Sequence, residues 1–149
     1  MKVAVTGKGG VGKTTLSSTL ARLYADEGRT VLAADVDPDA NLGLALGFSE
    51  ADLAAITPIT EMKELIRERT CADEFEKFFK INPKVDDLPD KLAREINGVK
   101  LLLMGTVKTG GAGCVCPEHV ILKRLLSHLI IGRDDVVIMD MEAGLEHLG

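Results

Sequence analysis

The sequence predicts an α/β domain with a mostly parallel sheet and helices on both faces. Short, nearly continuous runs of Val, Ile, Leu and Ala recur along the chain, and segments with apolar residues at helical spacing separate them. A glycine-rich stretch joins the first apolar run to the first helical segment. Strands without polar alternation need cover on both faces, and crossovers that contain helices give parallel, right-handed connections.

Each element follows from its local pattern. Four strands are predicted, and they cover residues 2–6, 30–35, 99–105 and 135–140. Leucine spacing predicts helices over 16–27 and 117–131. Residues 49–95 are more polar and predict a helical insertion over the sheet, with helices at 61–69 and 72–80. Because the chain stops soon after the last strand, we expect 1–149 to be the N-terminal part of a longer domain, incomplete at its C-terminus.

Composition and charge exclude several classes of protein. The 149 residues are 46% hydrophobic and carry 18 Lys and Arg against 23 Asp and Glu, a net charge of −5. No block of basic residues is present, so we expect no binding to nucleic acid or to anionic lipid. No apolar run approaches the roughly 20 residues of a membrane span, and no signal peptide opens the chain. We therefore expect a cytoplasmic protein that makes no membrane contact.

The glycine-rich stretch is the strongest functional signal. Residues 7–14 read GKGGVGKT and fit the pattern G-x-x-x-x-G-K-[ST], directly after a strand and before a helix. In such a P-loop, backbone amides surround phosphates, Lys13 supplies a cation and the Thr14 hydroxyl can ligate Mg²⁺. The predicted ATP-binding residues are Gly7, Lys8, Gly9, Gly10, Val11, Gly12, Lys13, Thr14 and Thr15. The sequence thus predicts a P-loop NTPase that binds ATP and Mg²⁺.

With its additional lysine at Lys8, the stretch KGGVGKTT resembles the deviant Walker A motif. This motif marks the ATPases that include MinD, ParA, the nitrogenase iron protein and the CooC-type nickel-insertion ATPases. The resemblance implies an ATP-dependent homodimer in which Lys8 reaches the nucleotide of the partner protomer. A cation added only in the dimer would act as an arginine finger does, by stabilising charge on the γ-phosphoryl group.

Aspartates stand where the second and last strands end. Phosphoryl transfer needs an oriented water and a bound Mg²⁺, and side chains at the carboxyl ends of neighbouring strands can provide both. Asp35, Asp37, Asp39 and Asp140 occupy such places, although Asp also serves turns and helix caps. The resemblance implies that Asp37 positions the attacking water and contacts Mg²⁺ indirectly, with Asp39 as the alternative. It implies that Asp140 ends the Walker B strand and holds a Mg²⁺-bound water, and that residues 141–147 are the second switch region.

A cysteine pair lies between the third strand and the last helix. In an extended segment Cys114 and Cys116 point to the same side, and two copies across a dimer axis would supply four thiolates. Such ligands suit Zn²⁺, Ni²⁺, Cu(I) or an iron-sulfur cluster; two buried apolar cysteines or a redox pair are the alternatives. Cys71 stands alone and is expected to be structural.

The resemblance to the CooC-type proteins covers most of the chain, including KLLLMGTVKTGGAGCVCPEH and VVIMDMEAGLEH. It implies a metallochaperone that holds Ni²⁺ or Zn²⁺ at Cys114 and Cys116 in the dimer interface. MgATP would close the dimer, and hydrolysis would release nickel to apo carbon monoxide dehydrogenase or a related nickel enzyme. One alternative is an electron donor like the nitrogenase iron protein, but the second switch here lacks that protein's cysteine. A MinD-type or ParA-type positioning ATPase is another.

Overall fold

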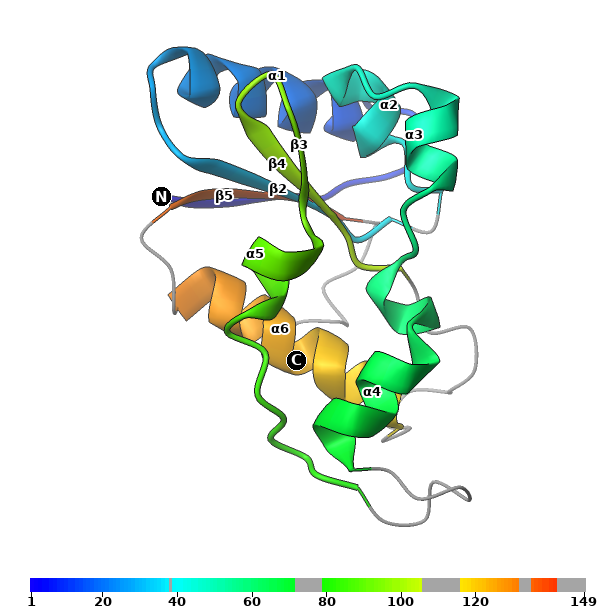
Figure 1. The fold of residues 1–149 in the computed structure, drawn as a ribbon. Helices are drawn as coiled ribbons and strands as arrows, with labels where there is room; N and C mark the ends of the chain where they lie inside the picture. The colour runs from blue at the N-terminus through cyan, green and yellow to red at the C-terminus, as the bar shows by residue number, and fades with distance from the viewer. Residues whose placement is uncertain (38, 72–78, 106–115, 132–134, 142–149) are drawn as a thin grey trace.

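The computed structural model describes residues 1–37, 39–71, 79–105, 116–131 and 135–141. These residues form one five-stranded sheet in the order β1-β5-β2-β4-β3, flanked by helices (Figure 1). The strands are β1 (Lys2–Val5), β2 (Val31–Asp35), β3 (Arg94–Ile96), β4 (Val99–Leu103) and β5 (Val136–Asp140). The helices are α1 (Lys13–Asp26), α2 (Leu42–Leu46), α3 (Glu50–Ala54), the 3₁₀ helix η1 (Ile59–Glu61), α4 (Lys63–Thr70), α5 (Leu88–Leu92) and α6 (Pro117–Ile131).

The sheet is parallel except at one edge. β1, β5, β2 and β4 run in the same direction, and β3 pairs antiparallel with β4. The carboxyl ends of the parallel strands are level, because Asp140 lies opposite both Val5 and Asp35 in the register, and Asp35 lies opposite Leu103. Side chains at these strand ends therefore share one edge of the sheet.

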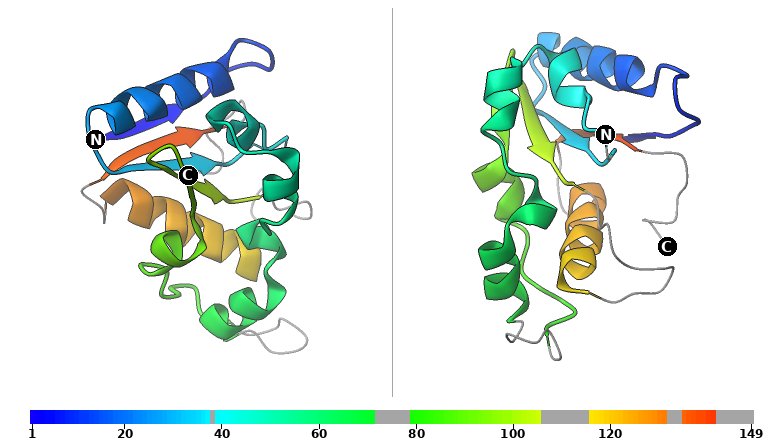
Figure 2. Two further views of the ribbon diagram at one scale, coloured as in Figure 1. Left: turned by 45° about the horizontal axis from the view of Figure 1, so that its top comes forward. Right: turned by 90° about the vertical axis from the view of Figure 1, so that its right-hand side faces the viewer.

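Helices cover both faces of the sheet, which confirms the predicted α/β class (Figures 1 and 2). α1 and α2 lie on one face, and α6 and α4 lie on the other. Along β2, Val31 and Ala33 join the core on the α1 side, whereas Leu32 and Ala34 join the core on the α6 side. This two-sided burial is the reason that the strands carry no alternation of polar and apolar residues.

The sequence pattern predicts no strand at β3, because residues 94 and 95 belong to the polar stretch 49–95. The structure corrects this: a two-residue turn at Asn97 and Gly98, with φ of 50° and 75°, folds β3 back onto β4. Left-handed backbone at both central residues is the geometry of a type I′ hairpin, which Asn-Gly favours. A three-residue strand with two exposed side chains leaves too short a pattern for recognition.

The longer predicted elements are confirmed, with ends that shift by a few residues. α1 begins at Lys13, ahead of the predicted residue 16, and α4 and α6 match the predicted helices at 61–69 and 117–131. The short helices α2, α3, η1 and α5 were not predicted. The helix expected at 72–80 falls mostly outside the described residues, and Phe79 and Lys80 are not helical.

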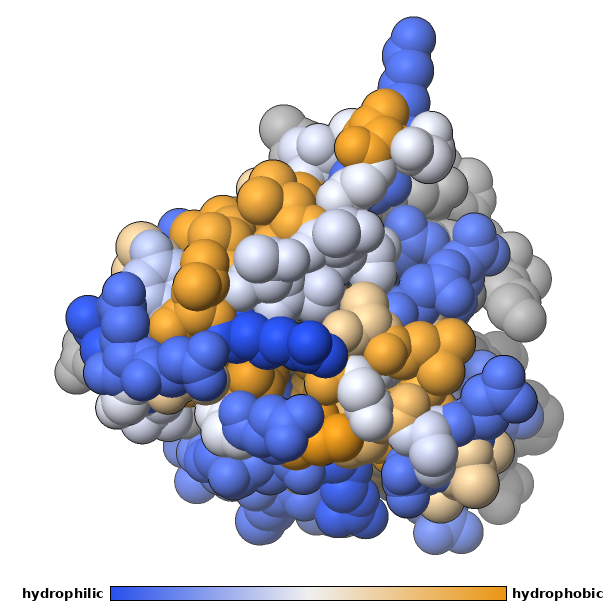
Figure 3. Space-filling model, turned by 90° about the horizontal axis from the view of Figure 1, so that it is seen from above, coloured by the Kyte–Doolittle hydropathy of each residue, from blue (hydrophilic) through white to orange (hydrophobic). Residues whose placement is uncertain are grey.

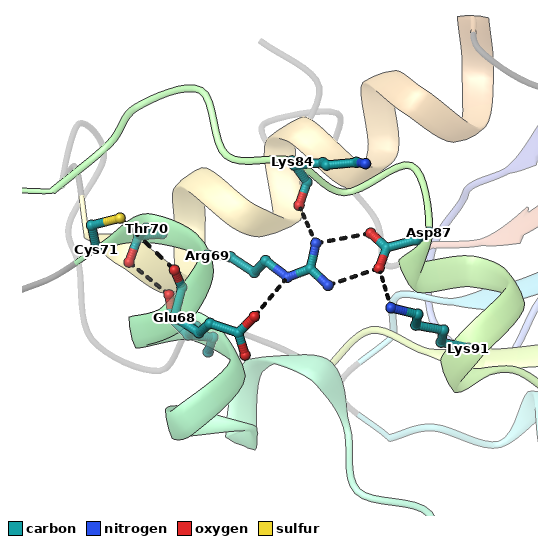
Figure 4. A network of polar contacts seen from close by, with 8 residues as sticks. Glu68, Arg69, Thr70, Cys71, Lys84, Asp87 and Lys91 are labelled. Atoms are coloured by element: carbon teal, nitrogen blue, oxygen red, sulfur yellow. Dashed lines mark hydrogen bonds and ion pairs between the residues drawn. The ribbon is translucent and has the colours of Figure 1, made fainter.

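A charged cluster joins α4 to the segment that precedes α5 (Figure 4). Arg69 donates two hydrogen bonds to the carboxylate of Asp87, at 2.9 and 2.7 Å, and a third to the carbonyl of Lys84 at 3.3 Å. Lys91 approaches the same carboxylate to 2.7 Å. These two cations hold the pKa of Asp87 well below its usual range. The cluster ties together segments that are 18 residues apart in sequence.

The face formed by α1 exposes apolar side chains in separate groups among polar ones (Figure 3). Leu16 and Leu23 on α1 and Leu44 on α2 are half exposed. Among the described helices, none is long and apolar enough to cross a bilayer.

Candidate nucleotide site

The loop between β1 and α1 lies at the carboxyl edge of the sheet, beside the ends of β2 and β5. Gly10 and Gly12 adopt φ of 76° and 90°, and a Cβ atom on either would meet nothing within 4 Å. Backbone conformation, and not lack of space, therefore requires glycine at both positions. Gly12 is the residue before α1, so the unpaired amides of the first turn face the loop, as phosphate binding needs.

Lys13 is the first residue of α1, and its side chain turns toward the end of β2. Its Nζ lies 4.0 Å from Oδ2 of Asp37, and the two side chains are only 9% and 18% exposed. Lys8 is exposed on the same loop, as are Gly9 and Val11. The structure thus brings Asp37 to the lysine of the P-loop.

Thr14 and Thr15 continue the first turn of α1. Thr14 is half-buried, whereas Thr15 is exposed. The carbonyl of Thr15 accepts hydrogen bonds from the hydroxyls of Ser18 and Thr19, at 3.1 and 2.7 Å. Of the two threonines, Thr14 therefore lies in the more enclosed environment.

Asp37 and Asp39 are placed differently, although the sequence offered both for the same role. The amide of Asp39 donates to Oδ1 of Asp37 at 3.0 Å, which orients the Asp37 carboxylate. Asp39 itself is exposed. This arrangement favours Asp37 as the carboxylate that acts beside Lys13.

Asp140 ends β5 beneath α1, with 1% of its surface exposed. Ser17 of α1 donates a hydrogen bond to its Oδ1 at 3.2 Å, while the buried Oδ2 accepts none from the described residues. A buried carboxylate oxygen without a donor is costly unless a cation or water satisfies it. Carboxylate oxygen is a ligand type that Mg²⁺ prefers, directly or through water. The residues present therefore fit a Mg²⁺ ion at this edge.

Asp35 is a second buried carboxylate, and sequence reasoning gave it no role of its own. It is 1% exposed, and its two oxygens accept the amides of Asp37 at 3.2 Å and Leu42 at 2.9 Å. Burial raises the pKa of Asp35 to about 7, and the charges of Asp140 and Asp37 add to the rise against the effect of the two amides. The sequence does contain a signal for the burial of Asp35. Val31 and Ala33 face α1, and Asp35 is the next residue at strand spacing on the same face.

The cysteine pair is only partly described. Cys114 lies outside the described residues, as do residues 142–147 of the expected second switch. Cys116 is half-buried just before α6, and its carbonyl accepts the amide of Val120 at 3.0 Å. In the part of the chain that the structure describes, no three His, Cys, Asp or Glu side chains gather as metal ligands. The proposed nickel or zinc site therefore remains a prediction.

Comparison with known proteins shows which family of sequences this chain resembles. Residues 2–109 match the family model described as the CobQ/CobB/MinD/ParA nucleotide binding domain. The whole chain is 53% identical to the carbon monoxide dehydrogenase accessory protein CooC of Rhodospirillum rubrum, and 53% identical to an uncharacterised ATP-binding protein of Methanocaldococcus jannaschii. It spans 57% of the length of each of these relatives.

A solved structure shares the fold. A plasmid partition protein of Borrelia burgdorferi superposes with a TM-score of 0.57 at 19% identity, covering 99% of this chain and 58% of that one. At that identity the likeness concerns the fold alone.

Proposed function

Because the chain belongs to the CobQ/CobB/MinD/ParA nucleotide-binding family, we propose that it binds and hydrolyses MgATP as a CooC-type metallochaperone. The observation that carries this proposal is the contact between Lys13 and Asp37 at the glycine loop, with the buried Asp140 nearby. The 53% identity to the R. rubrum accessory protein over the whole chain supports the choice of subgroup.

In the proposed complex, the amides of residues 7–15 and the Lys13 ammonium hold the phosphates of ATP. The Thr14 hydroxyl and Asp140, the latter through water, would hold Mg²⁺. An ion held there would neutralise negative charge on the phosphates of ATP. The buried Oδ2 of Asp140 supports this assignment, because it accepts no hydrogen bond from the described residues and can accept one from a Mg²⁺-bound water.

The contact between Lys13 and Asp37 suggests how substrate prepares the site. A γ-phosphate gives Lys13 a stronger anionic partner than the carboxylate at 4.0 Å, so Asp37 is released to accept a hydrogen bond from water. That water attacks the γ-phosphorus in line, the bond to the β–γ bridging oxygen breaks, and ADP and phosphate result. The Asp37 carboxylate accepts the proton that the water loses and later releases it to solvent.

The remainder of the cycle concerns the dimer and the metal. Lys8, exposed on the loop, reaches the nucleotide of a partner protomer. Closure on ATP joins two Cys114 and Cys116 pairs around Ni²⁺ or Zn²⁺, and hydrolysis opens the dimer. The nickel passes to apo carbon monoxide dehydrogenase or a related nickel enzyme. Only a ligand that prefers the closed form can drive this change, and the γ-phosphate is that ligand.

The first experiment tests the nucleotide site. We expect Lys13→Ala to weaken ATP binding at least about 10-fold and to lower hydrolysis by about 100-fold, because a charged group on the phosphates is lost. Isothermal titration and phosphate release measure the two effects. The matched control is Lys63→Ala, which removes an exposed lysine at the start of another helix. Equal activity of the two variants would contradict the proposal.

The second experiment tests the metal site. With MgATP and Ni²⁺ or Zn²⁺ present, we expect light scattering to show a dimer and metal analysis to show one ion per two chains. Cys114→Ser with Cys116→Ser should abolish metal uptake, while Cys71→Ser, which changes an exposed cysteine directly after α4, should not. A double variant that binds metal with unchanged affinity would refute the metallochaperone role and leave the ATPase role standing.

A further inference from the structure

We propose that Asp35 is a positioning residue, which holds Asp37 beside Lys13 by anchoring both ends of the connection from β2 to α2. The inference rests on the proposed function, in which Asp37 acts on the attacking water. Asp35 itself is only 1% exposed at the end of β2 and makes none of the proposed contacts to ATP.

The two oxygens of Asp35 bind the two ends of this connection. Oδ1 accepts the amide of Asp37, two residues onward, and Oδ2 accepts the amide of Leu42, the first residue of α2. One carboxylate therefore fixes the distance between the start and the end of the connection. Because Asp35 belongs to a central strand with parallel neighbours on both sides, the anchor itself is rigid.

The Leu42 contact also completes α2. The amide of the first helical residue has no partner within the helix, and Asn41, the residue before it, makes no side-chain cap. Asp35 supplies the missing acceptor from the sheet below. The anchor thus ties a five-residue helix to the strand that carries Asp37.

The chain between the anchors is held in a conformation that needs support. Ala40 has a φ of 43°, a left-handed backbone that a residue with a Cβ rarely adopts. Its amide donates to the carbonyl of Asp37 at 3.1 Å, and the amide of Asp39 donates to the Asp37 carboxylate. These contacts set the direction of the Asp37 carboxylate relative to its own backbone, and Asp35 sets the place of that backbone.

An apolar residue in place of Asp35 would fit its surroundings on β2. Val31 and Ala33 precede it on the same face of β2 and pack in an apolar core. A buried carboxyl group is retained against an apolar residue only where its hydrogen bonds matter to the structure or to the chemistry. Anchoring of two backbone amides beside a reactive carboxylate is such a use.

The test replaces Asp35 by asparagine, which has the same shape but one acceptor oxygen in place of two. One of the two amides must then face an NH₂ group. In the nucleotide-free chain, we expect hydrogen exchange at Asp37 or Leu42, measured by NMR, to accelerate at least about 10-fold. The matched control is Asp52→Asn, an exposed carboxylate that likewise accepts a backbone amide, that of Ser49. Exchange at both amides within twofold of the parent chain would overturn the anchor.

Catalysis gives the second measurement. With Asp37 displaced and the glycine loop intact, we expect Asp35→Asn to keep the affinity for MgATP within about threefold and to lower kcat by about 10-fold or more. A structural role alone would leave kcat per folded molecule unchanged, and that outcome would overturn the positioning role. If the parent chain itself hydrolyses no ATP, the proposed function fails, whereas the exchange experiment still decides whether Asp35 anchors Asp37.

Discussion

The carboxyl edge of the sheet and the Arg69 cluster both contain carboxylates, but the surroundings shift the pKa values of these carboxylates in opposite directions. In the cluster, Arg69 and Lys91 approach the carboxylate of Asp87, and the pKa of Asp87 falls (Figure 4). At the edge, Asp35 and Asp140 lie opposite each other in the register, the pKa of Asp35 rises to about 7, and Oδ2 of Asp140 has no donor among the described residues. Satisfied charges stabilise the fold, whereas uncompensated ones keep capacity for a ligand.

The largest effect on this contrast should come from Asp140→Asn. Removing the charge of Asp140 removes its repulsion of the Asp35 carboxylate. We therefore expect the nucleotide-free chain to gain about 1 kcal/mol of unfolding free energy. Hydrolysis should fall by about 100-fold, because the Mg²⁺-directed oxygen is replaced. Urea unfolding and phosphate release measure the two changes. A variant that loses stability and hydrolyses ATP at the parent rate would show that Asp140 is part of the structural framework only.

The opposite result is expected at the cluster. Arg69→Ala removes both hydrogen bonds to Asp87 and the packing of the arginine stem, so we expect a loss of about 2 kcal/mol in unfolding free energy. ATP affinity should not change, because the cluster makes no contact with the glycine loop in the described residues. Arg67→Ala, which removes an exposed arginine of the same helix, serves as the control and should cost little.

A smaller, pH-dependent effect is expected for Asp87→Asn. Because the pKa of Asp87 in the folded state lies below its ordinary value of 3.8, its contribution is fully present above about pH 4 and is lost as the pH falls further. We expect the variant to be about 1 kcal/mol less stable than the parent chain at pH 7. The difference should shrink as the pH falls from about 4 to about 2 in urea unfolding experiments. A constant difference over this range would mean that packing, and not charge, accounts for it.

The smallest effect should come from the start of α3, which lies outside both the carboxyl edge of the sheet and the Arg69 cluster. Ser49 caps α3 by accepting the amide of Asp52 at 3.1 Å, and its own amide donates to the Asp52 carboxylate. Ser49→Ala should lower unfolding free energy by about 0.5 kcal/mol, since α3 is short and exposed. Hydrolysis should stay at the parent rate. A fall in kcat would indicate that α3 supports the adjoining α2 and, through it, the Asp35 anchor.

Strong periodic patterns let the sequence predict much of the fold. The buried strands β2, β4 and β5 and the helices α1 and α6 carry long apolar runs or leucine repeats, and all were predicted. β3, α2 and α5 were not, because segments of three to five residues gain their stability from contacts with the rest of the fold and not from their own pattern. Asn97-Gly98 is a local turn signal that precedes β4, and it closes the hairpin between β3 and β4.

Some residues of the candidate site can likewise be predicted from the sequence, whereas contacts between distant segments cannot. The P-loop is a local motif, so Lys13 and Thr14 could be named from spacing alone. Strand ends indicated four aspartates, Asp35, Asp37, Asp39 and Asp140, and the family resemblance assigned roles to Asp37 and Asp140. Ser17 could not be connected with Asp140, since they are 123 residues apart in sequence and meet only when α1 packs on β5. Both Asp37 and Asp39 follow the same strand, and only the fold shows that Asp37 lies beside Lys13 while Asp39 is exposed.

By itself, the sequence determined the class of fold, the phosphate loop and the acidic strand ends, because each depends on residues close together along the chain. Only the tertiary structure decided which of those acids became buried, which gained a partner and which kept an oxygen without a donor. The register between β2 and β5 placed Asp35 opposite Asp140, and the packing of α1 above them excluded water from both. Desolvation and the nearness of like charge are properties of that arrangement, and they set the pKa of Asp35 near neutrality where an exposed aspartate would be fully ionised.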